Sequence, residues 1–85
     1  MAYTISYKSS VVKDLKKIRK NEVTRIVDVI EKSLANTPFE GIKLKGQFDG
    51  LFKYRVGDYR VIYAVLKDEV LVLRVGHRSK VYEKD

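Results

Sequence analysis

Two arginines are spaced to share an anion in the stretch YRVGDYR, residues 54–60. If Gly57 and Asp58 form a two-residue hairpin turn, Arg55 lies directly opposite Arg60 on the neighbouring strand. Like charges in that position destabilise a sheet. The two guanidinium groups therefore either diverge into solvent or hold an anion between them, and arginine binds phosphate oxygens through paired hydrogen bonds.

Strand alternation extends this cluster. Paired residues share a face of a sheet and successive residues alternate between faces, so Lys53 joins Arg55 and Arg60. The opposite face takes the aromatic and β-branched residues Phe52, Tyr54, Val56, Val61 and Tyr63. The sequence therefore predicts a sheet with one apolar face and one face that carries a cationic cluster. Solvated strand cations that share no ligand are the alternative.

The placement of the last strand depends on the turn around residues 67–69. A two-residue loop would put alternate apolar residues on the cationic face, namely Leu71, Leu73 and Val75. A three-residue loop would send those residues to the core, and Arg74 and Arg78 would join the cationic cluster. We expect three residues, because that arrangement separates charge from core.

Composition limits the possible functions. The chain of 85 residues carries 18 Lys and Arg against 11 Asp and Glu, a net charge of +7, with no cysteine and one histidine. We expect a single domain over residues 1–85, no metal site and no cofactor. The charge favours polyanions such as nucleic acid, an anionic membrane or an acidic protein; a soluble protein that is merely basic is the alternative. Since no stretch approaches the roughly 20 apolar residues of a membrane span and no signal peptide is visible, we expect a cytoplasmic protein without a membrane partner.

Hydrophobic periodicity predicts an α+β fold. Residues 2–7 alternate as a short strand, and Ser9 or Ser10 is expected to cap a first helix. A second helix, capped by Asn21, runs from Glu22 to about Ala35. After Pro38 the period changes from 3.6 to 2, which predicts strands near residues 51–56, 59–66 and 70–77. The order β-α-α-β-β-β indicates a two-layer fold with a helix hairpin packed on an antiparallel sheet meander.

Three segments carry a family resemblance: LKG, LFKYRVGDYRVIY and VLRVGHRSKVY. Together with the order of elements they resemble the RelE/ParE superfamily of toxin–antitoxin toxins, most closely its RelE branch. The resemblance spans nearly the whole chain and implies a single RelE-like toxin domain. It also implies the toxin of a type II system: a ribosome-dependent endoribonuclease that cleaves mRNA in the ribosomal A site, inhibits translation and is held inactive by a cognate antitoxin.

The resemblance also implies site residues. Catalytic positions fall on Lys53, Arg60, Arg78 and Tyr82. Family positions that help to bind RNA fall on Lys45 and Arg55. We also expect Arg74, from its place on the cationic face, Lys43, from the loop before residue 51, and Lys80 to bind RNA or the ribosome. One family lysine is replaced here by Leu51.

The chemistry of RNA cleavage suits such a site, because RNA carries its own nucleophile, the 2′-hydroxyl. The enzyme must deprotonate this group and stabilise a dianionic phosphorane. Arg60 and Arg78 suit the phosphorane, Lys53 is the candidate base, and Tyr82 could stack on a base of the RNA. His77 is either an acid or base, or a polar residue at a strand end.

Two other functions remain open on the same fold: a ParE-like poison of DNA gyrase, and a basic nucleic-acid-binding module without catalysis. The partner prediction rests on apolar residues expected on the cationic face, namely Leu51, Ile62, Ala64, Leu66, Val70 and Val72. An apolar patch of that size commonly marks an interface. We therefore expect an acidic, amphipathic antitoxin segment to cover it; scattered, solvated apolar residues are the alternative.

Overall fold

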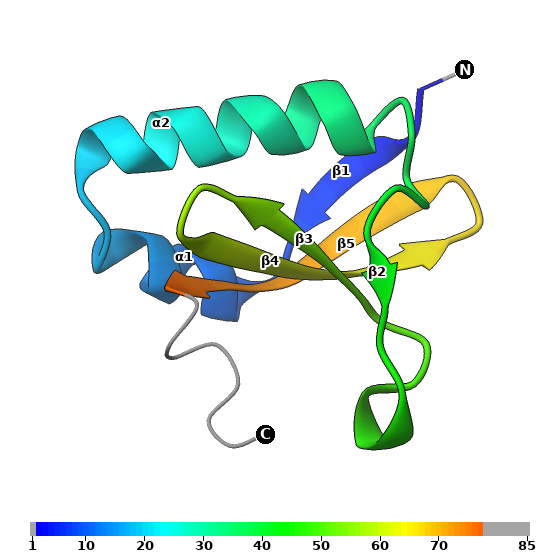
Figure 1. Ribbon diagram of the computed structural model, residues 1–85. Coiled ribbons are helices and arrows are strands. Elements are labelled where there is room, and N and C mark those ends of the chain that lie inside the picture. Colours follow the sequence, from blue (N-terminus) through cyan, green and yellow to red (C-terminus); the bar gives the residue numbers. More distant parts are fainter. Residues whose placement is uncertain (1, 78–85) are drawn as a thin grey trace.

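Two helices and five strands form over the part of the chain that the structure describes, residues 2–77 of a computed structural model (Figure 1). The strands are β1 (Thr4–Tyr7), β2 (Ile42–Lys43), β3 (Phe52–Val56), β4 (Tyr59–Leu66) and β5 (Glu69–His77). The helices are α1 (Ser9–Lys16) and α2 (Lys20–Val29), which a π-helical turn, η1 (Ile30–Leu34), prolongs; a 3-10 turn, η2 (Gly46–Phe48), precedes β3.

The strands make one mixed sheet in the order β1-β5-β4-β3-β2. Strand β1 runs parallel to β5, and the other neighbours are antiparallel. Helix α2 lies across one face of the sheet, and α1 lies beside the end of β5 (Figure 1). The expected two-layer α+β fold is confirmed. We call the sheet face opposite α2 the open face.

The core lies between α2 and the sheet. Ile26, Ile30 and Leu34 recur every four residues, so they share one side of the helix, and all three are fully buried. They pack with Val11 of α1 against Tyr63 and its neighbours in the sheet. Burying a side chain of this size contributes about 1.5–3 kcal/mol relative to leaving it in water. This stripe holds α2 on the sheet and leaves the open face for other contacts.

The helices begin slightly earlier than expected. Lys8 and Arg19 occupy the N-cap positions, and neither makes a side-chain capping bond. The predicted caps at Ser9 or Ser10 and at Asn21 were therefore wrong. The Ser10 hydroxyl instead donates to the Leu73 carbonyl oxygen of β5, at 2.9 Å.

The β3–β4 hairpin has the predicted register. Arg55 pairs with Arg60, and Val56 pairs with Tyr59 across the turn. Gly57 has φ of 62°, and a Cβ there would meet the guanidinium group of Arg25 from α2. The backbone conformation therefore favours glycine at this turn, whereas the flexible Arg25 side chain could move aside.

The β4–β5 turn differs from expectation. Leu66 pairs with Glu69, so the loop holds two residues rather than three. As a result Leu71 pairs with Ala64 on the open face and not in the core. The same register buries Val70 and Val72 completely, which corrects their predicted place on the open face. The predicted apolar surface on that face is therefore smaller than expected.

A β-bulge then reverses the alternation of β5. Tyr63 pairs with Val72, but its neighbour Ile62 pairs with Arg74, so Leu73 is the additional residue. Beyond the bulge Arg74 lies on the open face and Val75 is buried in the core. The faces of Arg74 and Val75 are therefore as predicted, but they result from the bulge and not from a three-residue turn.

Tyr63 anchors the segment that leads into β2. Its buried hydroxyl donates to the Pro38 carbonyl oxygen at 2.9 Å and accepts from the Gly41 N–H at 3.0 Å. A Cβ on Gly41 would lie 2.7 Å from the carbonyl oxygen of Lys53, so this segment passes tightly against β3. The contact holds Ile42 beside Lys53, its pairing partner.

The first prediction concerns this anchor. Tyr63→Phe leaves the Pro38 carbonyl and the Gly41 N–H without their partner, and such a loss costs about 1–3 kcal/mol. We expect the free energy of unfolding in guanidinium chloride to fall by about that amount, with an unchanged dependence on denaturant. An unchanged midpoint would contradict the anchoring role.

The same variant has a pH signature. Burial raises the pKa of Tyr63 above its ordinary value of 10.0. The folded protein therefore keeps this proton where the unfolded chain loses it, so the stabilisation is complete below about pH 10 and declines as the pH rises further. We expect a shallower decline in Tyr63→Phe than in the parent protein. Equal slopes would assign the effect to another group, such as Tyr7, whose pKa is also raised by burial and by Glu31.

Candidate functional site

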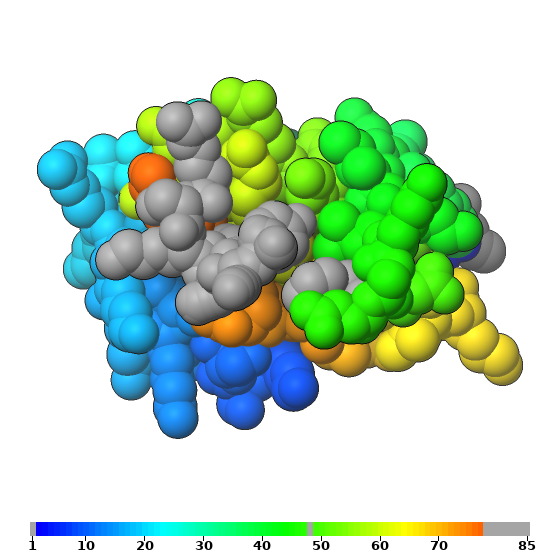
Figure 2. All heavy atoms as spheres, turned by 60° about the horizontal axis from the view of Figure 1, so that its bottom comes forward, coloured from blue at the N-terminus to red at the C-terminus, as the bar shows by residue number. Residues whose placement is uncertain are grey.

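Four cations occupy two adjacent cross-strand rows on the open face. One row runs Ile42–Lys53–Ile62–Arg74 from β2 to β5, and the next runs Arg55–Arg60–Gly76. We call Lys53, Arg55, Arg60 and Arg74 the cationic cluster. Figure 2 views this face, with α1 in blue at the lower left, β5 in orange and the segment that contains β2 in green at the right.

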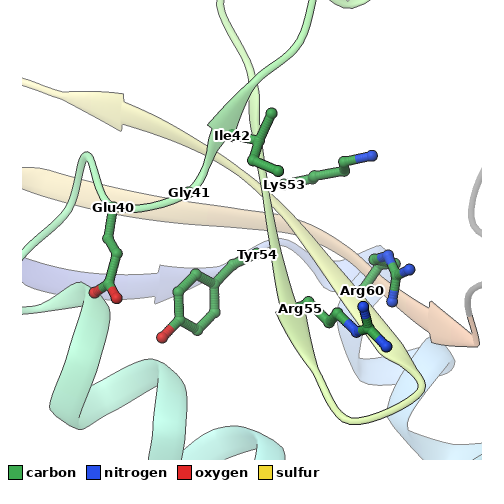
Figure 3. A pocket seen from close by; sticks show the side chains of 7 residues that line it. All are labelled: Glu40, Gly41, Ile42, Lys53, Tyr54, Arg55 and Arg60. Atoms are coloured by element: carbon green, nitrogen blue, oxygen red, sulfur yellow. The ribbon is translucent and has the colours of Figure 1, made fainter.

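A groove of about 450 Å³ borders three of these cations. It is lined by Glu40, Gly41, Ile42, Lys53, Tyr54, Arg55 and Arg60. Figure 3 shows Lys53, Arg55 and Arg60 projecting to one side of β3 and Glu40 and Tyr54 to the other. In the described part of the chain β2 pairs with only the first two residues of β3, so the groove follows an uncovered strand edge. It offers cations at one end and an aromatic ring with a carboxylate at the other.

Arg60 is the most enclosed arginine of the cluster. It is half-buried, and its Nη1 is buried without a hydrogen-bond partner among the described residues. An unsatisfied buried donor costs about 1–3 kcal/mol, and its neighbour Arg55 adds like-charge repulsion. An anion bound here would relieve both costs.

Arg25 adds a cation at the hairpin tip that sequence reasoning missed. Its guanidinium group lies against Gly57, whose carbonyl oxygen accepts a bond from Arg55 Nε at 3.2 Å. Arg25 also pairs with Glu22 at 3.3 Å on α2. A guanidinium group from α2, paired with a carboxylate, thus lies at the tip of the hairpin. The sequence carried no signal for this contact, because it depends on how α2 packs over the hairpin.

Arg74 differs from its neighbours because a carboxylate compensates it. Its Nε and Nη2 donate to the two oxygens of Asp14 at 3.0 and 3.3 Å. The Asp14 side chain is only 11% exposed. The bidentate pair fixes the direction of the Arg74 side chain beside the Lys53 row.

The remaining predicted residues fall elsewhere. Lys43 pairs with Phe52, which gives it the register of the helix-covered face, and Lys45 lies in the exposed loop before η2. His77 pairs with Tyr59 and packs edge-to-face on its ring at 5.7 Å, so its register places it on the face opposite Arg60. Arg78, Lys80 and Tyr82 lie outside the described residues.

Residues 2–77 contain neither a cluster of metal-binding side chains nor a membrane-spanning helix. No three His, Asp or Glu side chains in this range gather closely enough to hold a metal ion. None of its helices combines the length and the apolar composition needed to cross a bilayer.

Known proteins share this sequence pattern and architecture. Toxin RelG of Mycobacterium tuberculosis is 29% identical over 87 residues, covering 99% of this chain and 100% of RelG. The structure of the toxin–antitoxin complex RelBE2 from M. tuberculosis contains a chain that matches with a TM-score of 0.87 at 28% identity, covering 92% of this chain and 100% of that one. A chain of the archaeal RelE–RelB complex from Pyrococcus horikoshii is 31% identical with a TM-score of 0.66, covering 95% of this chain and 100% of that one.

A model of a protein family also matches most of the chain. The model described as the ParE toxin of the type II toxin-antitoxin system, parDE, matches residues 5–82. The match covers all five strands and both helices apart from Thr4. The chain therefore belongs to the ParE toxin family of type II toxin–antitoxin systems, within the RelE/ParE superfamily.

Proposed function

We propose that this toxin is a ribosome-dependent endoribonuclease that cleaves mRNA in the ribosomal A site. The observation that carries the proposal is the buried Nη1 of Arg60 in the cationic cluster, which has no hydrogen-bond partner among the described residues. A phosphate group is an acceptor that suits such a guanidinium group. The similarity to RelG and to chains from RelE complexes supports the same branch of the superfamily.

The proposed reaction uses the nucleophile of the RNA itself. The 2′-oxygen loses its proton and attacks the adjacent phosphorus, and the bond from phosphorus to the 5′-oxygen breaks. The products are a 2′,3′-cyclic phosphate and a 5′-hydroxyl end, which takes up a proton. Arg60 stabilises the charge of the phosphorane. The base must be an uncharged amine, so Lys53 in the neighbouring row receives the proton of the 2′-hydroxyl only after it has released its own.

Residues 78–82 complete the proposed site. Arg78 supplies a second positive charge to the phosphorane, and Tyr82 stacks on a base. The register of His77 on the opposite face favours a polar strand-end residue over an acid or base at Arg60. Among the described residues Glu40 lies on the other side of β3 from Lys53 and Arg60, and His77 has the register of the opposite face. A site without a His or Glu next to these cations would be a weak free nuclease, which fits an enzyme that depends on the ribosome to position its substrate.

A gyrase poison is the second candidate, because the family model that matches is that of ParE toxins. Such a toxin needs no cleavage chemistry, and Arg60 would then contact a protein or DNA acceptor. A basic nucleic-acid-binding module without catalysis is the third candidate. The cationic cluster favours cleavage over both, because it gathers Lys53 and Arg60 at one groove.

We also propose a cognate antitoxin as the partner. The related structures include the RelBE2 and RelE–RelB complexes. On this chain Ile42 and Leu66 are 64% and 48% exposed. Ile42 lies in the row of Lys53, and Leu66 lies at the far end of β4. An amphipathic segment could cover these exposed apolar residues with its apolar side and place its acidic residues near the cationic cluster.

Primer extension tests the reaction. The purified toxin should cut an mRNA only when ribosomes are translating it, and the cut should leave a 5′-hydroxyl end. Covalent gyrase–DNA adducts without mRNA cuts would support the ParE-like candidate instead, and neither product would support the binding module.

The role of Arg60 predicts opposite effects on activity and stability. Arg60→Ala removes a phosphorane donor, which typically costs about 10²–10³ in rate. It also removes a buried donor that residues 2–77 leave unsatisfied and the repulsion from Arg55, so the melting temperature should stay the same or rise. Arg19→Ala, at an exposed arginine outside the cluster, is the matched control. Arg78→Ala should lose activity to a similar extent; full activity of both Arg60 and Arg78 variants would refute the assignment.

A stacking role for Tyr82 predicts that the ring alone suffices. Tyr82→Phe should keep its cleavage rate, and Tyr82→Ala should lose about 1–3 kcal/mol of RNA interaction, or one to two orders of magnitude. If both variants are equally inactive, the hydroxyl group has a chemical role.

The antitoxin proposal predicts a salt-sensitive complex. Affinity should fall as salt rises, because acidic residues would neutralise the cationic cluster. Hydrogen exchange with and without antitoxin should show protection on β4 and near residues 78–82. An interface that includes neither region contradicts the proposal.

A further inference from the structure

Helix α1 closes the edge of β5 where β1 ends. Strand β1 pairs with β5 only as far as Val72. Beyond that point the Leu73 carbonyl oxygen accepts from the Ser10 hydroxyl at 2.9 Å, and the Val75 N–H donates to Asp14 Oδ2 at 2.9 Å. A helix thus satisfies backbone groups that a strand would otherwise pair.

These contacts coincide with the β-bulge. Leu73 is the residue that the bulge adds, and Arg74 and Val75 follow it directly. The single carboxylate of Asp14 accepts from the backbone of Val75 and from two nitrogens of the Arg74 side chain. It therefore fixes a backbone position and a side-chain direction in consecutive residues. We call Ser10 and Asp14 the bulge clamp.

The bulge decides what lies next to Arg60. With it, Arg60 faces Gly76 on β5. Without it, the register that holds from Leu66 to Tyr63 would continue, and Arg60 would face Val75 instead. An isopropyl group would then stand on the open face beside the guanidinium group, and Arg74 would point toward the core. The bulge replaces that side chain with a glycine and adds a cation to the next row.

We propose that Asp14 is a positioning residue for the proposed cleavage reaction, and this inference rests on that reaction. Through the bulge clamp it holds β5 in the register that puts Gly76 opposite Arg60 and Arg74 opposite Ile62, in the same row as Lys53. Asp14 lies on α1 and acts through the backbone of Val75 and the side chain of Arg74, not on the RNA. Its carboxylate is mostly buried, so the three bonds it accepts are shielded from water.

A surface ion pair is the simpler interpretation of Asp14 and Arg74, since Arg74 is 52% exposed. That interpretation accounts for the two bonds from the Arg74 side chain but does not explain the bond from the Val75 N–H. The two interpretations differ in what an amide would do at position 14. Asparagine keeps an oxygen that can accept from Val75, whereas alanine keeps none.

The experiment compares Asp14→Ala, Asp14→Asn and Asp28→Ala. Asp28 is a matched control, because it is an exposed helix carboxylate paired with Lys32 at 3.3 Å, and it lies away from β5. Two quantities are measured: the ribosome-dependent cleavage rate at saturating and limiting ribosome concentrations, and the amide hydrogen exchange of β5. Folding is checked by the near-ultraviolet circular dichroism of the core tyrosines.

We expect Asp14→Ala to lower kcat about tenfold or more, the effect of losing one charge-assisted bond, with KM changed much less. Exchange of the amides of residues 73–76 should rise about tenfold, while the core amides of β4 remain protected. Asp14→Asn should restore most of kcat, and Asp28→Ala should match the parent protein.

Three results would overturn the inference. One is a parent-like kcat in Asp14→Ala. Another is an equal loss in the alanine and asparagine variants, which would point to the ion pair alone. A third is an exchange increase spread over the whole sheet, which would indicate general destabilisation. A parent protein that cuts no mRNA would refute the proposed reaction and with it this role, whereas the exchange data would still report on the clamp.

Discussion

Tyr63 is the constraint on which the other features of the structure depend. Its ring is fully buried and stacks on Phe52 with centroids 5.3 Å apart. Its hydroxyl ties down the segment before β2, and its backbone forms the last regular pair before the bulge in β5. One side chain at the centre of the sheet therefore links the core, the wall of the groove and the register of the strand that faces Arg60.

The concentration of positive charge on the open face lowers the stability of the protein when no ligand is bound. Arg55 and Arg60 are direct cross-strand neighbours, and Arg60 buries a donor that no described residue satisfies. Arg74 is different, because Asp14 neutralises it within the chain. Within residues 2–77 one row thus holds an arginine paired with a carboxylate, and the adjacent row holds an arginine without such a partner. Proteins commonly place such local strain where a ligand later removes it.

Sequence reasoning reached the parts of the fold that local patterns determine. The Gly57-Asp58 turn correctly placed Arg55 opposite Arg60, and helical periodicity correctly predicted a second helix, whose residues Ile26 and Ile30 are buried. The length of the β4–β5 turn was predicted wrongly, because strand alternation does not indicate where a bulge changes the face of the residues that follow. That bulge depends on Ser10 and Asp14, which stand far from β5 in the chain. Of the candidate site, Lys53, Arg55, Arg60 and Arg74 could be grouped in advance. Arg25 and the register of Lys43 could not, because they follow from tertiary packing and from a two-residue strand.

The parallel pairing of β1 with β5 affects the order in which the protein can be assembled. Thr4 pairs with Glu69, so the first strand made by the ribosome has no partner until the last described strand has emerged. Contacts this distant in the chain form late and slowly. A nascent chain that lacks β5 also lacks the edge that α1 covers and the residue that faces Arg60. The surroundings of Arg60 are therefore complete only after residues 74–77 of β5 have been synthesised, which makes this corner of the sheet one of the last described parts of the chain to reach its folded arrangement.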